Sequence, residues 1–282
     1  MQPITRSQIK ALINLLGQEQ GSQAALLRDA LSYILKKHPT ILQEVIENDF
    51  HSEVPAALVR VMHEICWEDL LKTAQQFAQE DHLSLESALA FITRFVNPAF
   101  DTREISADLD KLTQELRPLL PTPDDGAAVL ETMSRFFFRQ KSFAVLPVSH
   151  DIKDVSFGRF LQKKQGAALC LCSLYAVCSQ RLGLHFDIVD VAGRLLIRYQ
   201  SPKNPEPLFA DPLKNACQLT LTDCKNYISS RNLEWNDSFI TPLSSRLILR
   251  RFWAQMIFIL NKLRDDKQLS YLRKYMDILQ EE

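Results

Sequence analysis

The chain has 282 residues, of which 46% are hydrophobic and 24% are charged, a balance typical of globular proteins with a sizeable core. Its 33 Lys and Arg residues nearly balance its 34 Asp and Glu residues, so charge predicts neither nucleic acid nor a membrane surface as a partner. Only 7 residues are glycine, which favours a helix-rich fold and leaves no room for a glycine-rich phosphate loop.

The first residues lack the apolar core of a signal peptide. The longest apolar runs, 167–178 and 252–260, are shorter than the ~20 residues that a membrane-spanning helix needs. We therefore expect a cytoplasmic protein without a membrane span.

Residues 1–120 are predicted to form an N-terminal helical bundle. Thr5 and Gln8 have the spacing of a capping box at the start of the first helix, and Gly17 is expected to end that helix. Apolar residues then recur at helical spacing through the rest of this part. Six further helices are expected, starting near residues 22, 40, 52, 68, 84 and 106.

The clearest break in the chain is the proline-rich segment 118–126. Beyond it we expect a helix at 127–138 and an irregular segment at 143–152. The next helix begins near Gly166 and ends at Gly183, and its apolar residues lie on nearly all sides. A helix of this kind is predicted to be buried at the centre of a domain.

The apolar period changes to two after this helix. Alternation predicts two antiparallel strands, 186–191 and 195–199, joined by a tight turn at 192–193. An acidic turn, Phe209–Pro212, is expected next. These elements, with a loop around Cys217 and a helix at 222–229, are predicted to form a core domain that spans residues 127–232.

Residues 239–282 are predicted to form an antiparallel pair of helices, because the join at 265–267 is short. Seven basic residues make this pair locally positive, which we interpret as a solvated helix face. The predicted fold class is therefore α+β and mainly helical, with an N-terminal helical bundle, a small α+β core with antiparallel strands, and the C-terminal helix pair.

Five segments, taken in order and spacing, resemble the bacterial transglutaminase-like proteins of the YchA/SirB type. They are residues 84–120, 130–146, 157–184, 191–199 and 209–213. Residues 244–279 are similar to the helical, tetratricopeptide-like tail of that family. The resemblance implies a papain-like core and a setting in the bacterial cytoplasm.

The wider superfamily works through a Cys-His-Asp triad, in which a helix N-terminus and a neighbouring His favour the Cys thiolate and the Asp orients the His. The resemblance carries these positions to Ala168, Arg194 and Asp211. Ala168 has no nucleophile, and Arg194 stays protonated and cannot act as the base. The resemblance therefore implies a degenerate triad without catalytic residues.

Arg194 and Asp211 are expected to contact each other, because a guanidinium can hold a carboxylate through two hydrogen bonds. The alternative is that Arg194 points to solvent or reaches for an anionic ligand, while Asp211 caps a local turn.

Cys170 is the remaining candidate nucleophile. It lies two residues beyond Ala168, about 200° around the helix, and should face away from the Ala168 side. The alternative is that Cys170, Cys172 and Cys178 are small core hydrophobes, as free cysteines usually are. The spacing of the six cysteines predicts neither a zinc site nor a disulfide, and no metal or other cofactor is expected.

Three functions follow from these observations. The first is a non-catalytic transglutaminase-like protein with a binding or regulatory role, whose partner is expected to be another protein. The second is a thiol-dependent hydrolase or acyl transferase that uses Cys170. The third is a helical adaptor that binds through the C-terminal helix pair. The sequence leaves the partner, the pathway and the oligomeric state open.

Overall fold

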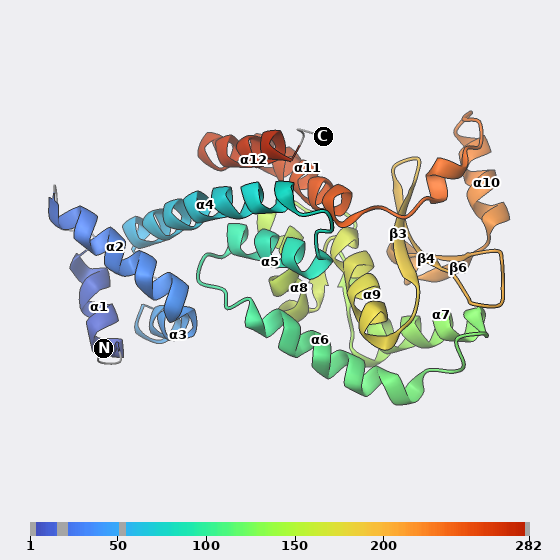
Figure 1. Cartoon of the computed structure of the whole chain (residues 1–282), viewed down its shortest axis with the longest axis horizontal. Coiled ribbons are helices and arrows are strands. Elements are labelled where there is room, and N and C mark those ends of the chain that lie inside the picture. The colour runs from blue at the N-terminus through green and yellow to red at the C-terminus, as the bar shows by residue number, and fades with distance from the viewer. Residues whose placement is uncertain (1–3, 16–21, 51–54, 280–282) are drawn as a thin grey trace. The chain divides into compact units, whose positions relative to one another are not determined.

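The computed structural model describes residues 4–15, 22–50 and 55–279. Within it the chain forms two compact units. The first comprises residues 1–80, 93–102 and 273–282, and the second comprises residues 81–92 and 103–272 (Figure 1). The division into domains at 1–120, 127–232 and 239–282 stays a prediction.

The described residues of the first unit form helices and connecting turns, and no strand. The expected capping box is confirmed, because the Thr5 N–H donates to Gln8 Oε1 at 2.9 Å and the Gln8 N–H donates to Thr5 Oγ1 at 3.3 Å. The helix stop predicted at Gly17 lies outside the described residues. The helices that belong wholly to this unit are α1 (Arg6–Leu15), α2 (Ser22–Lys37), α3 (Pro39–Asp49) and α4 (Ala56–Gln79).

The prediction of two helices starting near residues 52 and 68 was wrong. A single helix, α4, covers this region, because neither proline nor glycine interrupts its backbone hydrogen bonds between residues 56 and 79. Trp67, at the centre of α4, forms hydrogen bonds with two other helices of the chain. The Trp67 indole N–H donates to the Phe95 carbonyl at 3.1 Å. The Tyr275 hydroxyl in turn donates to the Trp67 carbonyl at 2.8 Å.

The second unit contains all the strands in the described residues and the helices that surround them. Its central helix is α9 (Ala168–Leu182), in which every residue from Leu169 to Ser179 is buried, as the sequence predicted. Gly183 ends α9 in the left-handed conformation, with φ 72°.

A four-stranded antiparallel sheet in the order β3-β4-β5-β6 packs beside α9 (Figure 1). The predicted hairpin is confirmed as β3 (Phe186–Val191) and β4 (Arg194–Tyr199). Ala192 and Gly193 between them both have positive φ, 49° and 87°, as a two-residue turn that matches the strand twist requires.

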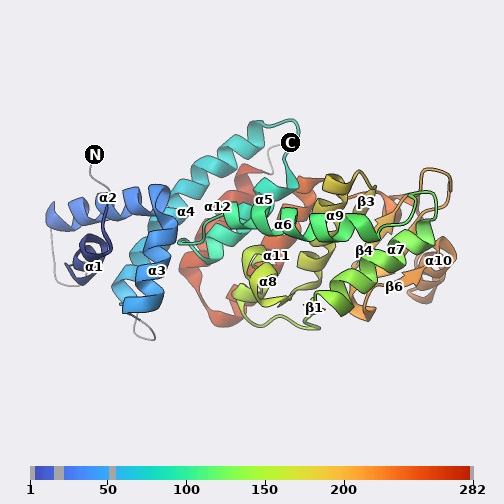
Figure 2. The ribbon, with the colours of Figure 1, turned by 90° about the horizontal axis from the view of Figure 1, so that it is seen from below.

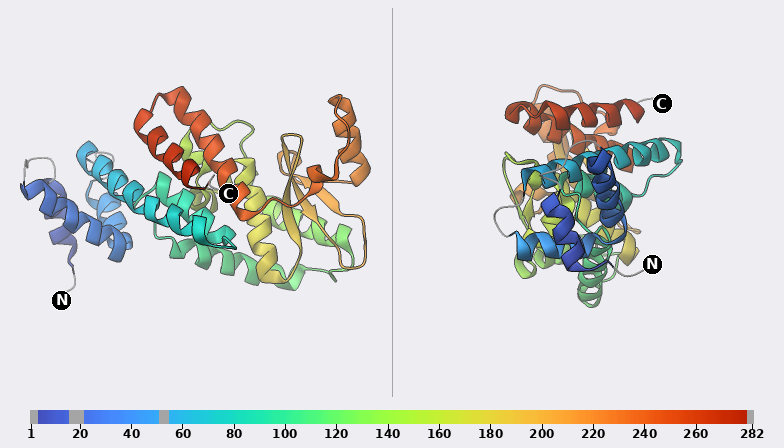
Figure 3. Two further views of the ribbon diagram at one scale, coloured as in Figure 1. Left: turned by 45° about the horizontal axis from the view of Figure 1, so that its top comes forward. Right: turned by 90° about the vertical axis from the view of Figure 1, so that its left-hand side faces the viewer.

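The sheet has two covered faces. On one face the Tyr175 ring of α9 lies 5.9 Å from the Phe186 ring, which stacks on Tyr199 across the hairpin. The helix α10 (Leu221–Ser230), orange in the left view of Figure 3, lies on the opposite side of the sheet from α9. Its residues Cys224 and Ile228 pack against strand residues. The strand residues of this second cluster are Val189, Val191, Leu196 and Phe209.

Two expectations about the rest of the sheet need correction. The segment Phe209–Pro212, predicted to be an acidic turn, is mostly strand: residues 208–211 form β5 (Leu208–Asp211), and the chain turns only after Asp211, in the short helix η4 (Pro212–Lys214). The segment around Cys217, predicted to be a loop, is strand β6 (Cys217–Leu219). Three residues are too few for a two-residue period to be seen, and backbone pairing with β5 makes this segment a strand.

The segment between the proline-rich break and α9 is more structured than expected. The predicted helix at 127–138 is α7 (Gly126–Ser134), which lies beside β6 and continues into a π-helix, η2 (Arg135–Gln140) (Figure 2). Strands β1 (Ala144–Val145) and β2 (Gln165–Gly166) form a parallel bridge. The helices η3 (Ile152–Val155) and α8 (Phe157–Lys163) lie between them.

The remaining helices of the chain belong wholly or partly to this unit. Helices α5 (Leu85–Val96) and α12 (Asp266–Ile278) each contribute residues to both units. The predicted C-terminal helix pair is confirmed as α11 (Ser245–Leu263) and α12. Among the described helices, none is both long and apolar enough to cross a membrane. The other helices are α6 (Arg103–Leu116), η1 (Arg117–Leu119) and η5 (Asp237–Ile240).

Candidate functional site

Ala168 is the first residue of α9 and is partly exposed. Because N–H groups at a helix N-terminus have no partner within the helix, this position attracts negative charge. The methyl side chain of Ala168 cannot carry the negative charge that this helix N-terminus would stabilise. Cys172 lies four residues later on the same face of α9, and the carboxylate of Asp211 is near enough to raise the pKa of its thiol further, beyond the larger effect of burial.

Arg194 and Asp211 contact each other as the sequence predicted. Arg194 opens β4 and Asp211 ends β5, and the register of the two strands places both side chains on one face of the sheet. Arg194 Nη2 donates to Asp211 Oδ2, and the Leu213 N–H donates to Oδ1 at 3.0 Å. Both oxygens of this carboxylate are therefore occupied.

Tyr227 of α10 covers the guanidinium of Arg194. The Arg194 Cζ lies 5.0 Å from the centroid of the Tyr227 ring, within the range of a cation–π contact. A second guanidinium, that of Arg231, lies 5.3 Å from the same centroid and donates to the Tyr227 hydroxyl at 3.0 Å. Arg194 is thus held between a carboxylate and an aromatic ring, on the face of the sheet that α10 covers.

The thiols beside this pair are held in the protonated form. Burial raises the pKa of Cys172, and it raises the pKa of Cys224 on α10 to about 11, although the charge of Arg194 opposes the second shift. Because the thiolate is the reactive form of cysteine, neither side chain is activated as a nucleophile.

Cys170 is fully buried on another side of α9. Its sulfur donates to the carbonyl of Val155 at 3.6 Å, and burial is the main cause that raises the pKa of its thiol. Cys178 is also fully buried, and its pKa is raised to about 12. The prediction that Cys170, Cys172 and Cys178 are core residues is confirmed.

No described cysteine has a histidine nitrogen as a hydrogen-bond partner. His150 is exposed in a loop, and His185 precedes β3 at the opposite end of the hairpin from Arg194. Within residues 4–15, 22–50 and 55–279, no three His, Cys, Asp or Glu side chains come together as a metal site.

Tyr227 and Cys224 are the residues of this site that sequence reasoning missed. Both come from α10, which was predicted as a helix, but no pattern in the sequence indicates which surface that helix covers. A cysteine three residues before a tyrosine gives one apolar helix face, and this was the only available signal.

The family model of the transglutaminase-like superfamily matches residues 103–254, which is just over half of the chain and includes Ala168, Arg194 and Asp211. The chain therefore belongs to the transglutaminase-like superfamily. A search of curated proteins and a search of solved structures each found no match.

Proposed function

We propose that this chain is a non-catalytic member of its superfamily that binds or regulates another protein in the bacterial cytoplasm. The observation that carries the proposal is the occupation of both Asp211 oxygens by Arg194 and the Leu213 N–H. A triad aspartate orients a histidine that exchanges protons, whereas a guanidinium stays protonated at physiological pH. The pair is therefore suited to hold β4 and β5 together and unsuited to relay a proton.

The proposal also includes the type of transglutaminase-like protein to which the chain belongs. The order of the segments from 84–120 to 209–213 favours a protein of the YchA/SirB type. The C-terminal pair, α11 and α12, would correspond to the tetratricopeptide-like tail of that type, although a single pair is not a repeat array.

The surroundings of Cys170 weigh against a thiol-dependent hydrolase or acyl transferase. A catalytic cysteine needs a base within reach and a lowered pKa. The partner of the Cys170 sulfur is a backbone carbonyl, which accepts a hydrogen bond and cannot remove the proton, and burial raises the pKa.

One observation favours the adaptor function as a second candidate. Phe258 and Leu263 on α11 are 57% and 58% exposed, so this helix presents two large apolar side chains to solvent. The ammonium of Lys262 lies 4.2 Å from the centroid of the Phe258 ring. Aromatic residues are enriched at the core of protein interfaces, whereas Lys is depleted there, so the Phe258 ring is the candidate anchor of this surface.

Activity assays on the purified protein test the non-catalytic proposal. Amine incorporation into casein and cleavage of fluorogenic peptides would be compared for the wild type, Cys170→Ala and the matched control Cys217→Ser. We expect no turnover above buffer in all three. Turnover that Cys170→Ala abolishes and Cys217→Ser retains would establish the thiol enzyme instead.

Affinity capture from the native host, followed by mass spectrometry, tests the binding role. The wild type would be compared with Phe258→Ser and with Leu119→Ser, a control at another exposed apolar residue of the second unit. A protein captured by the wild type and the control but lost with Phe258→Ser would place the interface on α11. If the wild type captures nothing beyond the tag alone, the binding role is contradicted.

A further inference from the structure

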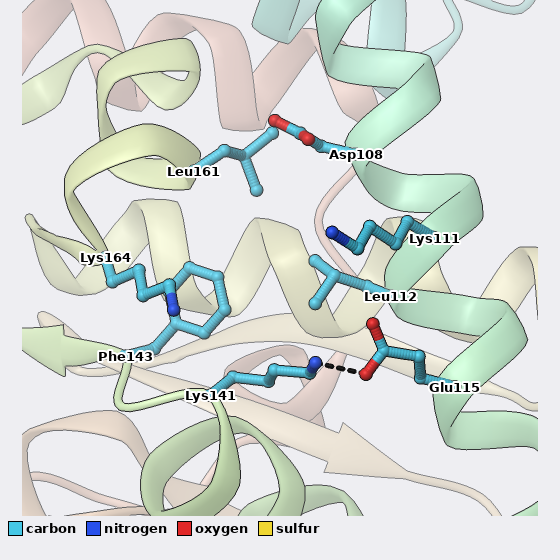
Figure 4. Close-up of a pocket in the computed structure, with 8 residues that line it drawn as sticks. All are labelled: Asp108, Lys111, Leu112, Glu115, Lys141, Phe143, Leu161 and Lys164. Carbon is cyan, nitrogen blue, oxygen red and sulfur yellow. Dashed lines mark hydrogen bonds and ion pairs between the residues drawn. The ribbon is translucent and has the colours of Figure 1, made fainter.

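A hollow of about 130 Å³ lies in the second unit (Figure 4). Helix α6 forms one side of it, and the residues that follow η2 and the C-terminal end of α8 form the other. Its floor is apolar and consists of Leu112, Phe143 and Leu161, which are 9%, 3% and 7% exposed. Its rim is charged and consists of Asp108, Lys111, Glu115, Lys141 and Lys164. None of the residues that line the hollow is a position of the degenerate triad, although Lys164 lies four residues before Ala168.

Unusual backbone conformations shape one wall of this hollow. Ser142 and Lys164 have positive φ values of 60° and 56°, which residues other than glycine rarely adopt. The two segments are joined where the Ala144 N–H donates to the Lys164 carbonyl at 2.8 Å. Lys141 directly follows the π-helix η2, a type of turn frequent at functional sites. The positions from which Lys141 and Lys164 extend are thus fixed by backbone pairing.

The charges around the hollow do not cancel. Lys141 and Glu115 form an ion pair (Figure 4). The hydrogen bond from Lys141 is the main cause that lowers the pKa of the Glu115 carboxyl, and the charges of Lys111 and Lys164 act in the same direction. Within the described part of the chain, the ammonium groups of Lys111 and Lys164 form no hydrogen bond or ion pair. With Asp108 they leave the hollow one net positive charge.

We propose that this hollow binds a small monocarboxylate that carries a short apolar chain. Lys111 on α6 and Lys164 on the opposite wall would hold the carboxylate (Figure 4). The apolar chain would lie on the floor formed by Phe143 and Leu161. Water occupies about 30 Å³ per molecule in the liquid, so the space corresponds to about four waters and limits the ligand to a few carbon atoms.

The net charge of the rim favours a monocarboxylate over a phosphate dianion at this site. A monoanion makes the rim neutral, whereas a dianion leaves excess negative charge beside the carboxylates of Asp108 and Glu115. Two kinds of molecule carry a carboxylate with a short apolar chain: a free short-chain acid, and a peptide at its C-terminal residue. The inference is independent of the proposed function, because it involves neither Arg194 nor Asp211.

Nuclear magnetic resonance titration of the full-length protein tests this inference, with isovalerate as the probe. We expect saturable binding with a Kd on the order of 1 mM. The backbone amides of Ser142, Phe143 and Gln165 should shift. Acetate should bind at least threefold more weakly because it lacks the apolar chain, and isovaleramide and inorganic phosphate should bind at least tenfold more weakly.

The variant for this test is Lys111→Gln/Lys164→Gln, and its matched control is Lys72→Gln/Lys163→Gln, which removes two exposed lysines outside the hollow. The first variant should weaken isovalerate binding at least tenfold, and the control should change it less than twofold. Competition by acetyl-glycyl-leucine identifies a peptide C-terminus as the source, and its failure to compete identifies a free acid.

Three results would overturn the inference. These are equal binding by the two double variants, binding of isovaleramide or phosphate as tight as that of isovalerate, and no shift of the named amides at 50 mM probe. The comparison of probes on the wild-type protein needs no variant, so it holds even where a substitution impairs folding.

Discussion

Arg194 covers a carboxylate that has almost no other access to solvent: the Asp211 side chain is 2% exposed, and the Arg194 side chain that pairs with it is 20% exposed. Removal of the guanidinium would leave a buried negative charge that accepts a hydrogen bond from the Leu213 N–H but has lost its cationic partner. The relationship is therefore asymmetric, because Asp211 depends on Arg194 for neutralisation more than Arg194 depends on Asp211.

A double-mutant cycle tests the coupling of the two residues. We expect Arg194→Ala to lower the free energy of unfolding by about 2–4 kcal/mol, because breaking one half of a buried pair is strongly destabilising. Asp211→Ala should cost a similar amount, since it also removes the acceptor of the Leu213 N–H. Urea denaturation measures each variant.

The double variant decides whether the side chains are coupled. It should be more stable than the sum of the single effects predicts, by at least about 1 kcal/mol. Strict additivity would mean that the two side chains do not stabilise one another. Arg231→Ala is the matched control, because Arg231 contacts Tyr227 from an exposed position, and we expect it to change stability by less than about 0.5 kcal/mol.

The six thiols should separate into one reactive group and five protected groups. Cys217 on β6 is exposed, whereas the other five cysteines are buried. Burial raises the pKa of Cys66 and of Cys224 to about 11. A disulfide reagent added to the native protein at pH 8 should therefore label one thiol rapidly and the rest only after denaturation. The Cys217→Ser variant should lose the rapid phase. Rapid labelling that persists in this variant would contradict the described burial.

Gly166 should not tolerate a side chain. A Cβ at this position would lie 2.9 Å from the backbone oxygen of Asp154 and 3.0 Å from the ring of Phe160. Since the Asp154 oxygen also accepts from the Ala167 N–H, it cannot move away freely. We expect Gly166→Ala to destabilise the protein by about 1–3 kcal/mol in thermal denaturation.

Gly183→Asn is the matched control for this substitution. Gly183 has φ 72° and no atom within 4 Å of an added Cβ, and Asn tolerates the left-handed conformation better than other residues. The control should cost less than Gly166→Ala, about 1 kcal/mol or less, because Asn still meets part of the penalty that a side chain incurs at positive φ. An equal effect of both substitutions would rule out steric contact as the reason for glycine at 166.

Features with a long, regular pattern were predictable from the sequence. The hairpin at 186–199 and the buried helix α9 each repeat an apolar period often enough to identify the element. The contact between Arg194 and Asp211 was also predicted, because the resemblance placed both at a known pair of neighbouring strand positions. Helix and strand periods are local properties, so these two elements could be identified without knowledge of the segments that pack against them.

What could not be predicted depends on contacts between distant segments. The bridge between β1 and β2 has two residues on each side, so it has no period to detect. The left-handed conformation of Lys164 is imposed by its surroundings, since lysine has no preference for it. Tyr227 on helix α10 contacts Arg194 on strand β4. In each case the physical cause is tertiary packing, which a single sequence does not specify.

Two aspartates should give the stability of the protein opposite pH dependences in the acid range. Burial opposes ionisation of Asp69, but hydrogen bonds from Lys36 and Arg94 outweigh it, so the pKa of Asp69 is lowered from 3.8. The folded protein therefore binds protons at this site less readily than the unfolded chain. The contribution of Asp69 to stability is present above pH ~4 and is lost as the pH falls through the folded pKa.

Asp187 on β3 changes the stability of the protein with pH in the opposite direction. Burial raises its pKa from 3.8, and the opposing charge of Arg198, 3.6 Å away, does not compensate. Ionisation of Asp187 therefore destabilises the folded state, and this effect develops as the pH rises through 3.8 towards the folded pKa.

The measurement is the free energy of unfolding of Asp69→Asn and Asp187→Asn, relative to wild type, at pH 3 and pH 6. Asp69→Asn should be close to wild type at pH 3 and less stable by about 1–2 kcal/mol at pH 6, because Lys36 and Arg94 then lack their shared partner. Asp187→Asn should gain stability relative to wild type over the same interval. The Asn side chain does not titrate, so each difference reports the wild-type carboxyl alone. A difference that stays constant with pH would contradict the ion pairs of Asp69 in the first variant, and the dominance of burial over the charge of Arg198 in the second.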